Sequence, residues 1–438
     1  MCGIAGFCDF TKRSSLERLR QMTDMLSHRG PDDGGYQFVE TESAQVGLGH
    51  RRLSIIDLSA LGHQPMTDFF QRAWIIFNGE IYNHHELRKE LEALGERFVS
   101  RTDTEVLLIA YLVWGAKCVH RFNGMWSFVI WDIEKKLLFL SRDRSGKKPL
   151  YYAHNNGTFV FASQLKALRV FSEFPWEINL KAFNAYLALG YVPGEHAFFS
   201  PAQKLSPGHF AFFDLNTGNL QTHRYWFLPY FQSNSERINE HNHNAYFLDK
   251  LENLTQTAVA LRLEADVPVG VLLSSGVDSS ILAALATRVK GKGNVKTFTV
   301  KMPDSKLDES VNARKIAEYL GTEHYELPAP PSSVDLLPEL VEYCDEPVAD
   351  SSILPTFILS RLTKEHVTVA LGGDGGDEIF GGYRHYPQVL EFQQQWGWIP
   401  ASFWKIAGTM AGTILPVGFK GRNRLASFRK GLEKSWLL

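Results

Sequence analysis

Cys2 directly follows the first methionine of the sequence. Because the cysteine side chain is small, we expect Met1 to be removed, which leaves Cys2 at the true N-terminus. A free α-amine has a reference pKa of roughly 7.7–8.0, so it can act as general base for the thiol of the same residue. The position therefore allows a nucleophilic cysteine that needs no separate histidine. Taken alone, Cys2 is equally compatible with a cysteine placed there by chance.

A second group of reactive residues lies in the second half of the chain. Residues 269–280 read VGVLLSSGVDSS, a Ser/Gly-rich turn between an expected strand and an expected helix. Backbone N–H groups and the helix dipole can hold phosphate at such a turn. The GK[ST] ending of a Walker A loop is missing. A serine-rich turn without a ligand is the alternative.

Acidic residues also lie among glycines at residues 372–378, which read GGDGGDE. Asp374, Asp377 and Glu378 could belong to a solvated loop. A site for a metal ion and phosphate explains both the charges and the glycines, because hard cations prefer oxygen ligands.

The elements that must position these residues differ between the two halves. In the first half, short apolar runs predict strands at residues 73–77, 127–131, 137–140 and 210–213, and helices are expected at 15–26 and 85–94. In the second half, strands expected at 267–273, 295–300 and 367–371 alternate with helices from about Ser279 and at 310–320. That alternation predicts a parallel sheet with helices on its faces.

The connection between the halves is expected at residues 229–244, which are polar and lack periodicity. After it, Phe247, Leu251, Leu254, Ala258 and Leu261 recur at helical spacing. A chain of 438 residues exceeds the usual size of one domain, so two compact domains are expected.

Composition and charge exclude several classes of function. With 44% hydrophobic and 21% charged residues the chain is of the globular type, and its net charge of -2 suggests no nucleic acid or membrane surface as partner. The four cysteines show no metal-type spacing and follow no signal peptide, so a cytoplasmic location is expected. Residues 401–419 contain Lys405 and Pro416 and predict a helical region that does not cross a bilayer.

Several motifs follow Cys2 in a fixed order. The chain opens with MCGIAGF and continues with HRGPDD, RRLSIID, FNGEIYNH and RTDTEV at residues 28–33, 51–57, 77–84 and 101–106. FNGMWSF, SRDRSGKKPLYY and FAS come later, at 122–128, 141–152 and 161–163. Together they resemble the class II glutamine amidotransferases, which are N-terminal nucleophile glutaminases. The resemblance implies an αββα sandwich, a glutaminase domain at residues 2–225.

The resemblance also implies roles for single residues. Cys2 would attack the side-chain amide of glutamine and release ammonia. The Asn78 side chain and the Gly79 N–H would form the oxyanion hole. Without the other motifs, Asn78-Gly79 would first indicate a turn.

The charged groups of glutamine would be held by residues that alone resemble ordinary surface charges. Arg52 would bind the α-carboxylate through its guanidinium, and Asp103 with the Glu80 region would bind the α-ammonium. The residues that continue the glutamine-binding strand after Arg52 are Leu53, Ser54, Ile55 and Ile56.

The turn at residues 274–279 resembles the pyrophosphatase loop of ATP-pyrophosphatase synthetases, which normally reads SGGxDS, with Ser275 in place of a glycine. LDES, LGTEH, DEPVADSSILPTFILSR and VALGGDGGDEIFGGY follow at residues 307–310, 320–324, 345–361 and 369–383. In order and spacing they resemble the asparagine synthetases. The resemblance implies a Rossmann-like parallel α/β domain at residues 245–438.

The implied nucleotide site has ATP and Mg²⁺ as its cofactors. Leu273 and Val300 would line the adenosine, Asp278 and Asp377 would bind Mg²⁺ on the pyrophosphate, and Asp374 would lie near an aspartyl adenylate. The full set expected at ATP is Leu273, Ser274, Ser275, Gly276, Asp278, Ser279, Val300, Gly372 and Gly373.

The expected reaction converts aspartate, ATP and glutamine to asparagine, AMP, pyrophosphate and glutamate, in a chain that resembles enzymes often found as homodimers. Two alternatives stay open: amidation of another carboxylate, on a surface polysaccharide or secondary metabolite, and a glutaminase-only or regulatory chain. The family usually continues beyond GGDGGDE with KVDRxSM-like and ExRxPFLD-like stretches. Residues 389–438 lack both, so a C-terminally truncated synthetase domain is expected.

Overall fold

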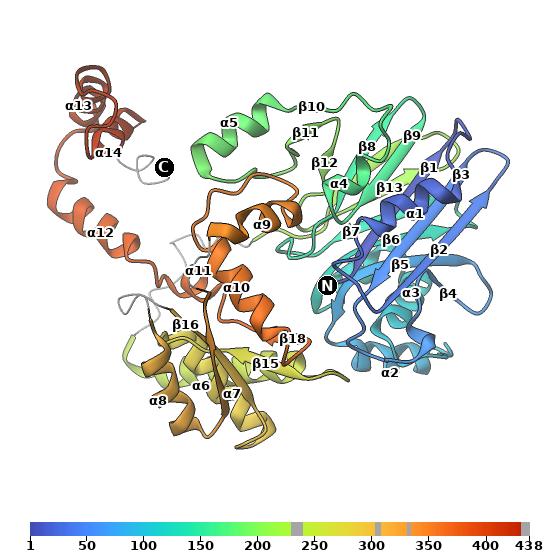
Figure 1. Cartoon of the computed structure of the whole chain (residues 1–438), viewed down its shortest axis with the longest axis horizontal. Helices are drawn as coiled ribbons and strands as arrows, with labels where there is room; N and C mark the ends of the chain where they lie inside the picture. The colour runs from blue at the N-terminus through green and yellow to red at the C-terminus, as the bar shows by residue number, and fades with distance from the viewer. Residues whose placement is uncertain (229–239, 303–307, 331–333, 431–438) are drawn as a thin grey trace. The chain divides into compact units, whose positions relative to one another are not determined.

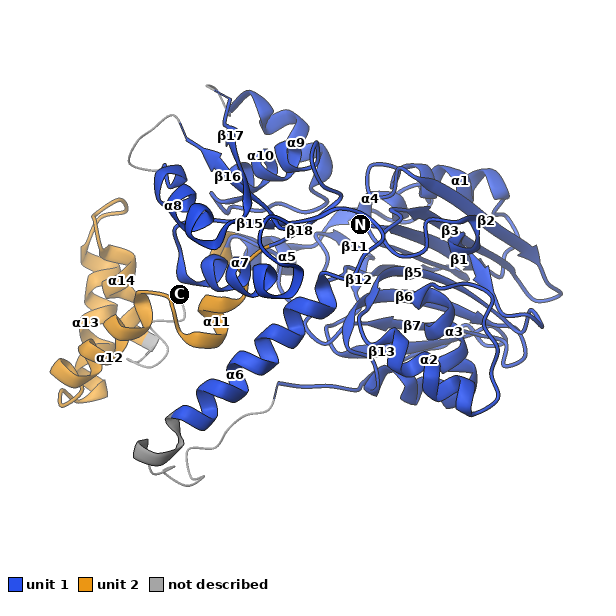
Figure 2. Ribbon diagram, turned by 90° about the horizontal axis from the view of Figure 1, so that it is seen from below, with its two compact units in different colours: residues 1–186, 190–371 blue, residues 187–189, 372–438 orange. Residues whose placement is uncertain are grey.

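A computed structural model describes residues 1–228, 240–302, 308–330 and 334–430. The chain divides into two compact units, residues 1–186 with 190–371 and residues 187–189 with 372–438 (Figure 2). Up to residue 226 the elements are β1 (Gly3–Asp9), α1 (Leu16–Asp24), β2 (Asp33–Glu40), β3 (Gln45–Arg52), η1 (Ala60–Gly62), β4 (Met66–Thr67), β5 (Ala73–Ile81), α2 (His84–Ala93), α3 (Asp103–Trp114), η2 (Gly115–His120), β6 (Gly124–Asp132), β7 (Leu137–Arg142), β8 (Tyr151–Asn155), β9 (Thr158–Ala162), α4 (Leu165–Leu168), β10 (Glu177–Ile178), α5 (Leu180–Leu189), β11 (Phe199–Ser200), β12 (Gln203–Lys204), β13 (His209–Asp214) and β14 (Leu220–Arg224).

Two six-stranded sheets form the centre of this half (Figure 1). Their strand orders are β12-β8-β9-β1-β3-β2 and β14-β13-β7-β6-β5-β4. Alternate side chains of each sheet face the other, and Ile4, Val46, Ile76, Val129 and Leu138 share one buried cluster between them. The strands expected at 73–77, 127–131, 137–140 and 210–213 lie in β5, β6, β7 and β13.

Helices cover the outer face of each sheet. Leu19 and Met22 of α1 pack with Phe7 of β1, whereas Val106 of α3 packs with Phe77 of β5. The resulting helix–sheet–sheet–helix order confirms the αββα sandwich expected from the sequence.

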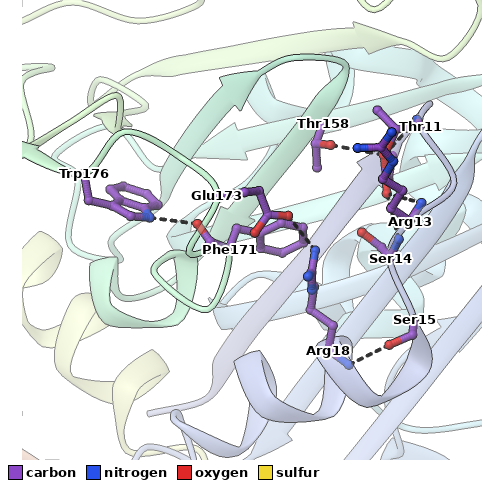
Figure 3. A network of polar contacts seen from close by, with 10 residues as sticks. Thr11, Arg13, Ser14, Ser15, Arg18, Thr158, Phe171, Glu173 and Trp176 are labelled. Carbon is purple, nitrogen blue, oxygen red and sulfur yellow. Dashed lines mark hydrogen bonds and ion pairs between the residues drawn. The ribbon is translucent and has the colours of Figure 1, made fainter.

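Polar contacts fix the turn between β1 and α1 (Figure 3). The Asp9 carboxylate accepts hydrogen bonds from the backbone N–H of Thr11 and Ser14, both at 2.8 Å. Ser15 then begins α1 by accepting from the Arg18 N–H at 3.2 Å, and Arg18 pairs with Glu173 at 2.6 Å. These contacts hold α1 against β1, the strand that directly follows Cys2.

The remaining described elements of the first unit form a parallel sheet with helices. They are α6 (Glu240–Arg262), β15 (Val269–Leu272), α7 (Val277–Lys290), β16 (Lys296–Lys301), α8 (Ser310–Leu320), β17 (Glu323–Pro328), η3 (Val334–Leu336), α9 (Leu337–Tyr343), α10 (Ile353–Thr363) and β18 (Val369–Leu371). The strand order is β17-β16-β15-β18, and every neighbouring pair is parallel. The expected parallel sheet is confirmed, and β17 is an additional strand that the sequence pattern did not indicate.

The helix expected after the connection is present, and the residues that it buries are not those whose spacing indicated it. Residues 229–239 of the expected connection lie outside the described residues, and α6 already begins at Glu240. Phe247, Leu251 and Leu254 are exposed, and Val259 and Leu263 are buried instead. The reason is that Val259 and Leu263 join the core cluster containing Val271 of β15 and Ala283 of α7.

The second unit consists of short helices, α11 (Gly376–Phe380), α12 (His385–Trp396), α13 (Ala401–Ile414), α14 (Arg422–Ser427) and η4 (Phe428–Lys430). The rings of Phe392, Trp404 and Phe428 stack together, with centroids 5.0–5.6 Å apart. α13 confirms the helical region expected at residues 401–419. Within the described part of the chain, none of the helices has the length and apolar character required to cross a bilayer.

Candidate active site

Cys2 opens into a cavity of about 270 Å³ in the first unit. Its sulfur lies between the two backbone polar groups of Leu53: the Leu53 N–H donates to Sγ at 3.4 Å, and the Leu53 carbonyl lies 3.7 Å from Sγ. The Arg29 Nε donates to the Cys2 carbonyl at 3.0 Å. The turn after β3 and the HRG motif thus fix the position of Cys2 just before β1.

Burial sets the protonation of the groups around the sulfur. It lowers the pKa of the α-amine of Met1, which also lines the cavity, to about 6, because the ammonium loses its hydration. Burial also raises the pKa of the Cys2 thiol. The α-amine of Met1 is therefore mostly neutral near pH 7, and the same burial would favour a neutral α-amine on Cys2 once Met1 is removed.

Asn78 and Gly79 lie together on β5 and line the same cavity. Asn78 is fully buried, its Oδ1 has no hydrogen-bond partner among the described residues, and its Nδ2 lies at a long 3.5 Å from the Ser127 hydroxyl. A Cβ on Gly79 would come within 2.1 Å of the Met125 carbonyl oxygen, so only glycine fits beside β6. The amide of Asn78 is thus left available for a ligand.

The charged side chains of the cavity are strongly buried. Asp103 begins α3 and accepts from the Ile81 N–H at 2.9 Å, and burial raises its pKa to about 7. Burial also raises the pKa of Glu80. An added ammonium group would favour the charged form of both carboxylates.

Arg52 lines the cavity while its guanidinium also holds the following loop. It donates to the carbonyls of Ile56 and Ser59, each at 3.2 Å, and to that of Asp57 at 2.5 Å. Arg52 therefore shapes the loop that carries Ile55 and Ile56.

The structure brings nearly all the expected glutamine-binding residues together. Those that line the cavity with Cys2 are Arg52, Leu53, Ile55, Ile56, Asn78, Gly79, Glu80 and Asp103. Ser54 does not line it, and its N–H donates to Asp32 at 2.8 Å.

Lys148 is a cavity residue to which the sequence gave no role. It is buried, and burial lowers the pKa of its ammonium, while Glu80 acts in the opposite direction. It belongs to the SRDRSGKKPLYY motif, so the motif could have pointed to it. Arg29 was missed in the same way, although it lies in HRGPDD.

One side of the cavity comes from the second half of the chain. Thr368, Val369 and Ala370, at and just before β18, line it. Nearby in sequence to β15, the Asp266 N–H donates to the Ile55 carbonyl at 2.9 Å, and its carboxylate accepts from the Asp57 N–H at 2.8 Å. The loop on the rim of the cavity is thus bonded to the segment that leads into the parallel sheet.

The expected phosphate loop lies between β15 and α7 in the first unit. Its N–H groups bind acceptors: Ser274 N–H donates to the Ser279 hydroxyl at 3.1 Å, and Gly276 N–H to the Ser274 hydroxyl at 3.1 Å. The Ser275 N–H donates to the Glu309 carboxylate at 3.0 Å, so this turn already binds an anionic group. Ser275 has no left-handed φ, so serine fits there without strain.

The other expected nucleotide residues lie around that loop or in the second unit. Leu273 is buried, and its carbonyl accepts from the Thr299 hydroxyl, next to Val300 on β16. Asp278 is partly buried in the first turn of α7, where its carboxylate fits the oxygen donors that Mg²⁺ prefers. Gly372, Gly373, Asp374 and Asp377 belong to the second unit, with Gly375 at a φ of 92° before α11.

Family comparison identifies both halves. The glutamine amidotransferase domain family matches residues 1–226, and the asparagine synthase family matches residues 250–435. The chain belongs to the glutamine-hydrolysing asparagine synthetase family. This is a family of ligases that take the amido group from glutamine.

Individual relatives show how much of that family the chain spans. The putative glutamine-hydrolysing asparagine synthetase 2 of Methanocaldococcus jannaschii is 36% identical over 87% of this chain and 76% of its own length. Asparagine synthetase 1 of Bacillus subtilis is 35% identical over 97% of this chain and 65% of its own length. The amidase chyE of Penicillium rubens is 30% identical over 91% of this chain and 61% of its own length. The chain thus spans 61–76% of the length of these family members.

Proposed function

We propose that this chain is a glutamine-hydrolysing asparagine synthetase, which amidates the side-chain carboxylate of aspartate through β-aspartyl-AMP. The N-terminal amine takes the proton of the Cys2 thiol as the sulfur attacks the glutamine amide. The Asn78 amide and Gly79 N–H stabilise the oxyanion. Ammonia leaves, and water hydrolyses the thioester to glutamate.

ATP is the second reactant in this proposal. The N–H groups at Ser274–Ser275–Gly276 and the start of α7 bind its phosphates, with Leu273 and Val300 beside the adenosine. Asp278 and Asp377 would supply carboxylate oxygens to Mg²⁺, and the ion would neutralise phosphate charge. Ammonia then displaces AMP from the activated carboxylate, and Asp374 lies near that adenylate.

One observation carries the proposal. The cavity of Cys2 is lined by Thr368, Val369 and Ala370, which run directly into the glycine-rich acidic segment at residues 372–378. This continuity supports the proposal, because the strand that lines the cavity of Cys2 is joined in sequence to the segment expected at the adenylate.

A second candidate is amidation of a carboxylate other than aspartate. It is favoured by the similarity to the amidase chyE, which shows that relatives with a different name share most of this chain. In this case the chemistry at Cys2 and at ATP is unchanged, and only the acceptor differs.

The test is to incubate the purified chain with glutamine, ATP, Mg²⁺ and aspartate and to follow glutamate, asparagine and pyrophosphate together. Cys2→Ala and Asp278→Ala are the controls. Glutamate, asparagine and pyrophosphate formed in equal amounts support the proposal. In each control variant the three products should be lost or should no longer form in equal amounts.

Glutamate without asparagine would contradict asparagine synthesis by this chain: the second domain would then be incomplete or would act on another carboxylate. Absence of glutamate would contradict the role of Cys2. The homodimer and the cytoplasmic location expected from the sequence stay predictions.

A further inference from the structure

Three metal-ligating side chains meet where the two halves of the first unit join. His84 and His85 begin α2 of the glutaminase half, and Glu264 follows α6 of the second half. One potential ligand atom from each residue lies within 4.8 Å of the other two. None of the three lines the cavity of Cys2.

His84 has the hydrogen bonding of a metal ligand. It is only 2% exposed, and its Nδ1 lies 3.0 Å from the Ile81 carbonyl oxygen. Because that oxygen can only accept, Nδ1 carries the proton, and Nε2 has a free lone pair. Nε2 has no hydrogen-bond partner among the described residues. A backbone carbonyl that binds the other ring nitrogen is the usual support of a metal-bound histidine.

His85 and Glu264 provide the solvent-facing side of the cluster. The His85 Nε2 is hydrogen-bonded to the Glu264 carboxylate, and the two side chains are 58% and 43% exposed. The rings of His84 and His85 lie 4.1 Å apart. An ion can reach the cluster from solvent, and the two exposed side chains can rotate toward it.

We propose that His84, His85 and Glu264 bind a divalent transition-metal ion of the zinc class, which links α2 to the segment between α6 and β15. Two imidazoles and one carboxylate are a ligand set that suits Zn²⁺, with water in the fourth position. Tetrahedral ligands of zinc lie about 3.3 Å apart, so the proposal requires the exposed His85 and Glu264 side chains to rotate toward the Nε2 of His84.

The simpler alternative is a histidine–carboxylate pair without a metal. The chain contains such a pair at His63 and Asp33, whose Nδ1 and carboxylate oxygen are 2.7 Å apart. Among the described residues, His63 and Asp33 have no third side chain close enough to complete a group that could hold a metal ion. His63→Ala is therefore a matched control for His85→Ala.

The test is a calorimetric titration of the full chain with Zn²⁺ after treatment with a chelator. The parent carries Cys2→Ala, which removes the nucleophilic thiol as a competing ligand. We expect one site, a melting temperature that rises with Zn²⁺, and a dissociation constant at least 10-fold weaker in His85→Ala and in Glu264→Gln. His63→Ala should bind Zn²⁺ as the parent does.

Both tested residues are exposed, so the variants are expected to fold. Equal Zn²⁺ affinity in the parent, His85→Ala and Glu264→Gln would overturn the proposal, and so would a parent that binds no Zn²⁺. A Zn²⁺-dependent rise in melting temperature that persists in both variants would place the ion elsewhere.

Discussion

At the scale of single residues, Asn78 combines complete burial with an amide that is poorly satisfied by its surroundings. We expect Asn78→Ala to lower kcat for glutamine hydrolysis by about 10²–10³-fold, because one oxyanion donor is lost. The variant should keep its melting temperature, since the removed oxygen has no hydrogen-bond partner among the described residues. Glutamate release and thermal unfolding measure the two effects.

Asn216→Ala is the control, since that asparagine is exposed in the turn after β13. It should change neither quantity. A large drop in the melting temperature of Asn78→Ala, alongside its loss of activity, would mean that Asn78 acts in folding instead.

Asp103 predicts a pH dependence of glutamine binding. Burial raises its pKa to about 7, and binding the α-ammonium requires the carboxylate. We therefore expect KM for glutamine to rise as pH falls below about 7. In Asp103→Asn, KM should be at least 10-fold higher and nearly independent of pH between 6 and 8, as measured by glutamate release.

The same residue affects stability with a definite sign. Its pKa in the fold is raised above the ordinary 3.8, so the folded state binds the proton more tightly and ionisation costs stability as pH rises from about 4 through 7. Asp103→Asn should therefore melt at a higher temperature than the parent at pH 8 without glutamine. A lower melting temperature of Asp103→Asn at pH 8 would contradict the conclusion that burial of the ionised Asp103 carboxylate costs stability.

At the scale of elements, the segment between α6 and β15 is bonded to the loop after β3. We expect Asp266→Ala to raise KM for glutamine about 5-fold, because loss of one hydrogen bond to the Asp57 N–H, worth about 1 kcal/mol, loosens the rim of the cavity. Glutamate release measured against glutamine concentration is the readout.

Asp249→Ala, an exposed residue on α6, is the control and should leave KM unchanged. An unchanged KM in Asp266→Ala as well would show that the loop keeps its shape without the Asp266 carboxylate, through Arg52 and the backbone bond from residue 266 to Ile55.

Sheets and helices differ in how well the sequence predicts them. Alternating apolar runs predicted strands in the larger sheets, and the ordered motifs indicated a set of residues most of which line the cavity of Cys2. Both depend on local pattern. Their role in binding glutamine stays a prediction. The buried side of α6 was not predictable from its own spacing, because it depends on packing against β15 and α7. The contacts of Asp266 were not predictable either, because Asp57 and Asp266 are 209 positions apart in sequence. Ser54 does not line the cavity: the Leu53 N–H is the group that faces the sulfur of Cys2, and the Ser54 N–H is bonded to Asp32 instead.

At the scale of the whole molecule, Glu346 joins the second half to the glutaminase half. Its carboxylate lies 2.5 Å from the Lys204 ammonium and accepts from the Phe198 N–H at 2.8 Å and the Tyr151 hydroxyl at 3.2 Å. Both side chains of the ion pair are about nine-tenths buried. We expect Glu346→Ala to cost about 3 kcal/mol, because Lys204 loses its partner in a buried place. Urea unfolding measures the loss.

The exposed pair of Glu339 and Arg361, 3.0 Å apart, provides the comparison. Glu339→Ala should cost less than about 1 kcal/mol. Equal losses in the two variants would show that Glu346 makes no special contribution to the junction.

The wall formed by Thr368–Ala370 has a consequence for dividing the protein. If the chain were cut in the connection before α6, the glutaminase fragment would lack one side of its cavity and the Asp266 contacts to its rim. We expect such a fragment to hydrolyse glutamine poorly alone and to recover when the complementary fragment is added. A single chain keeps the two halves that build the cavity at equal amounts. We therefore expect that neither half can be exchanged for that of a distant relative without its counterpart.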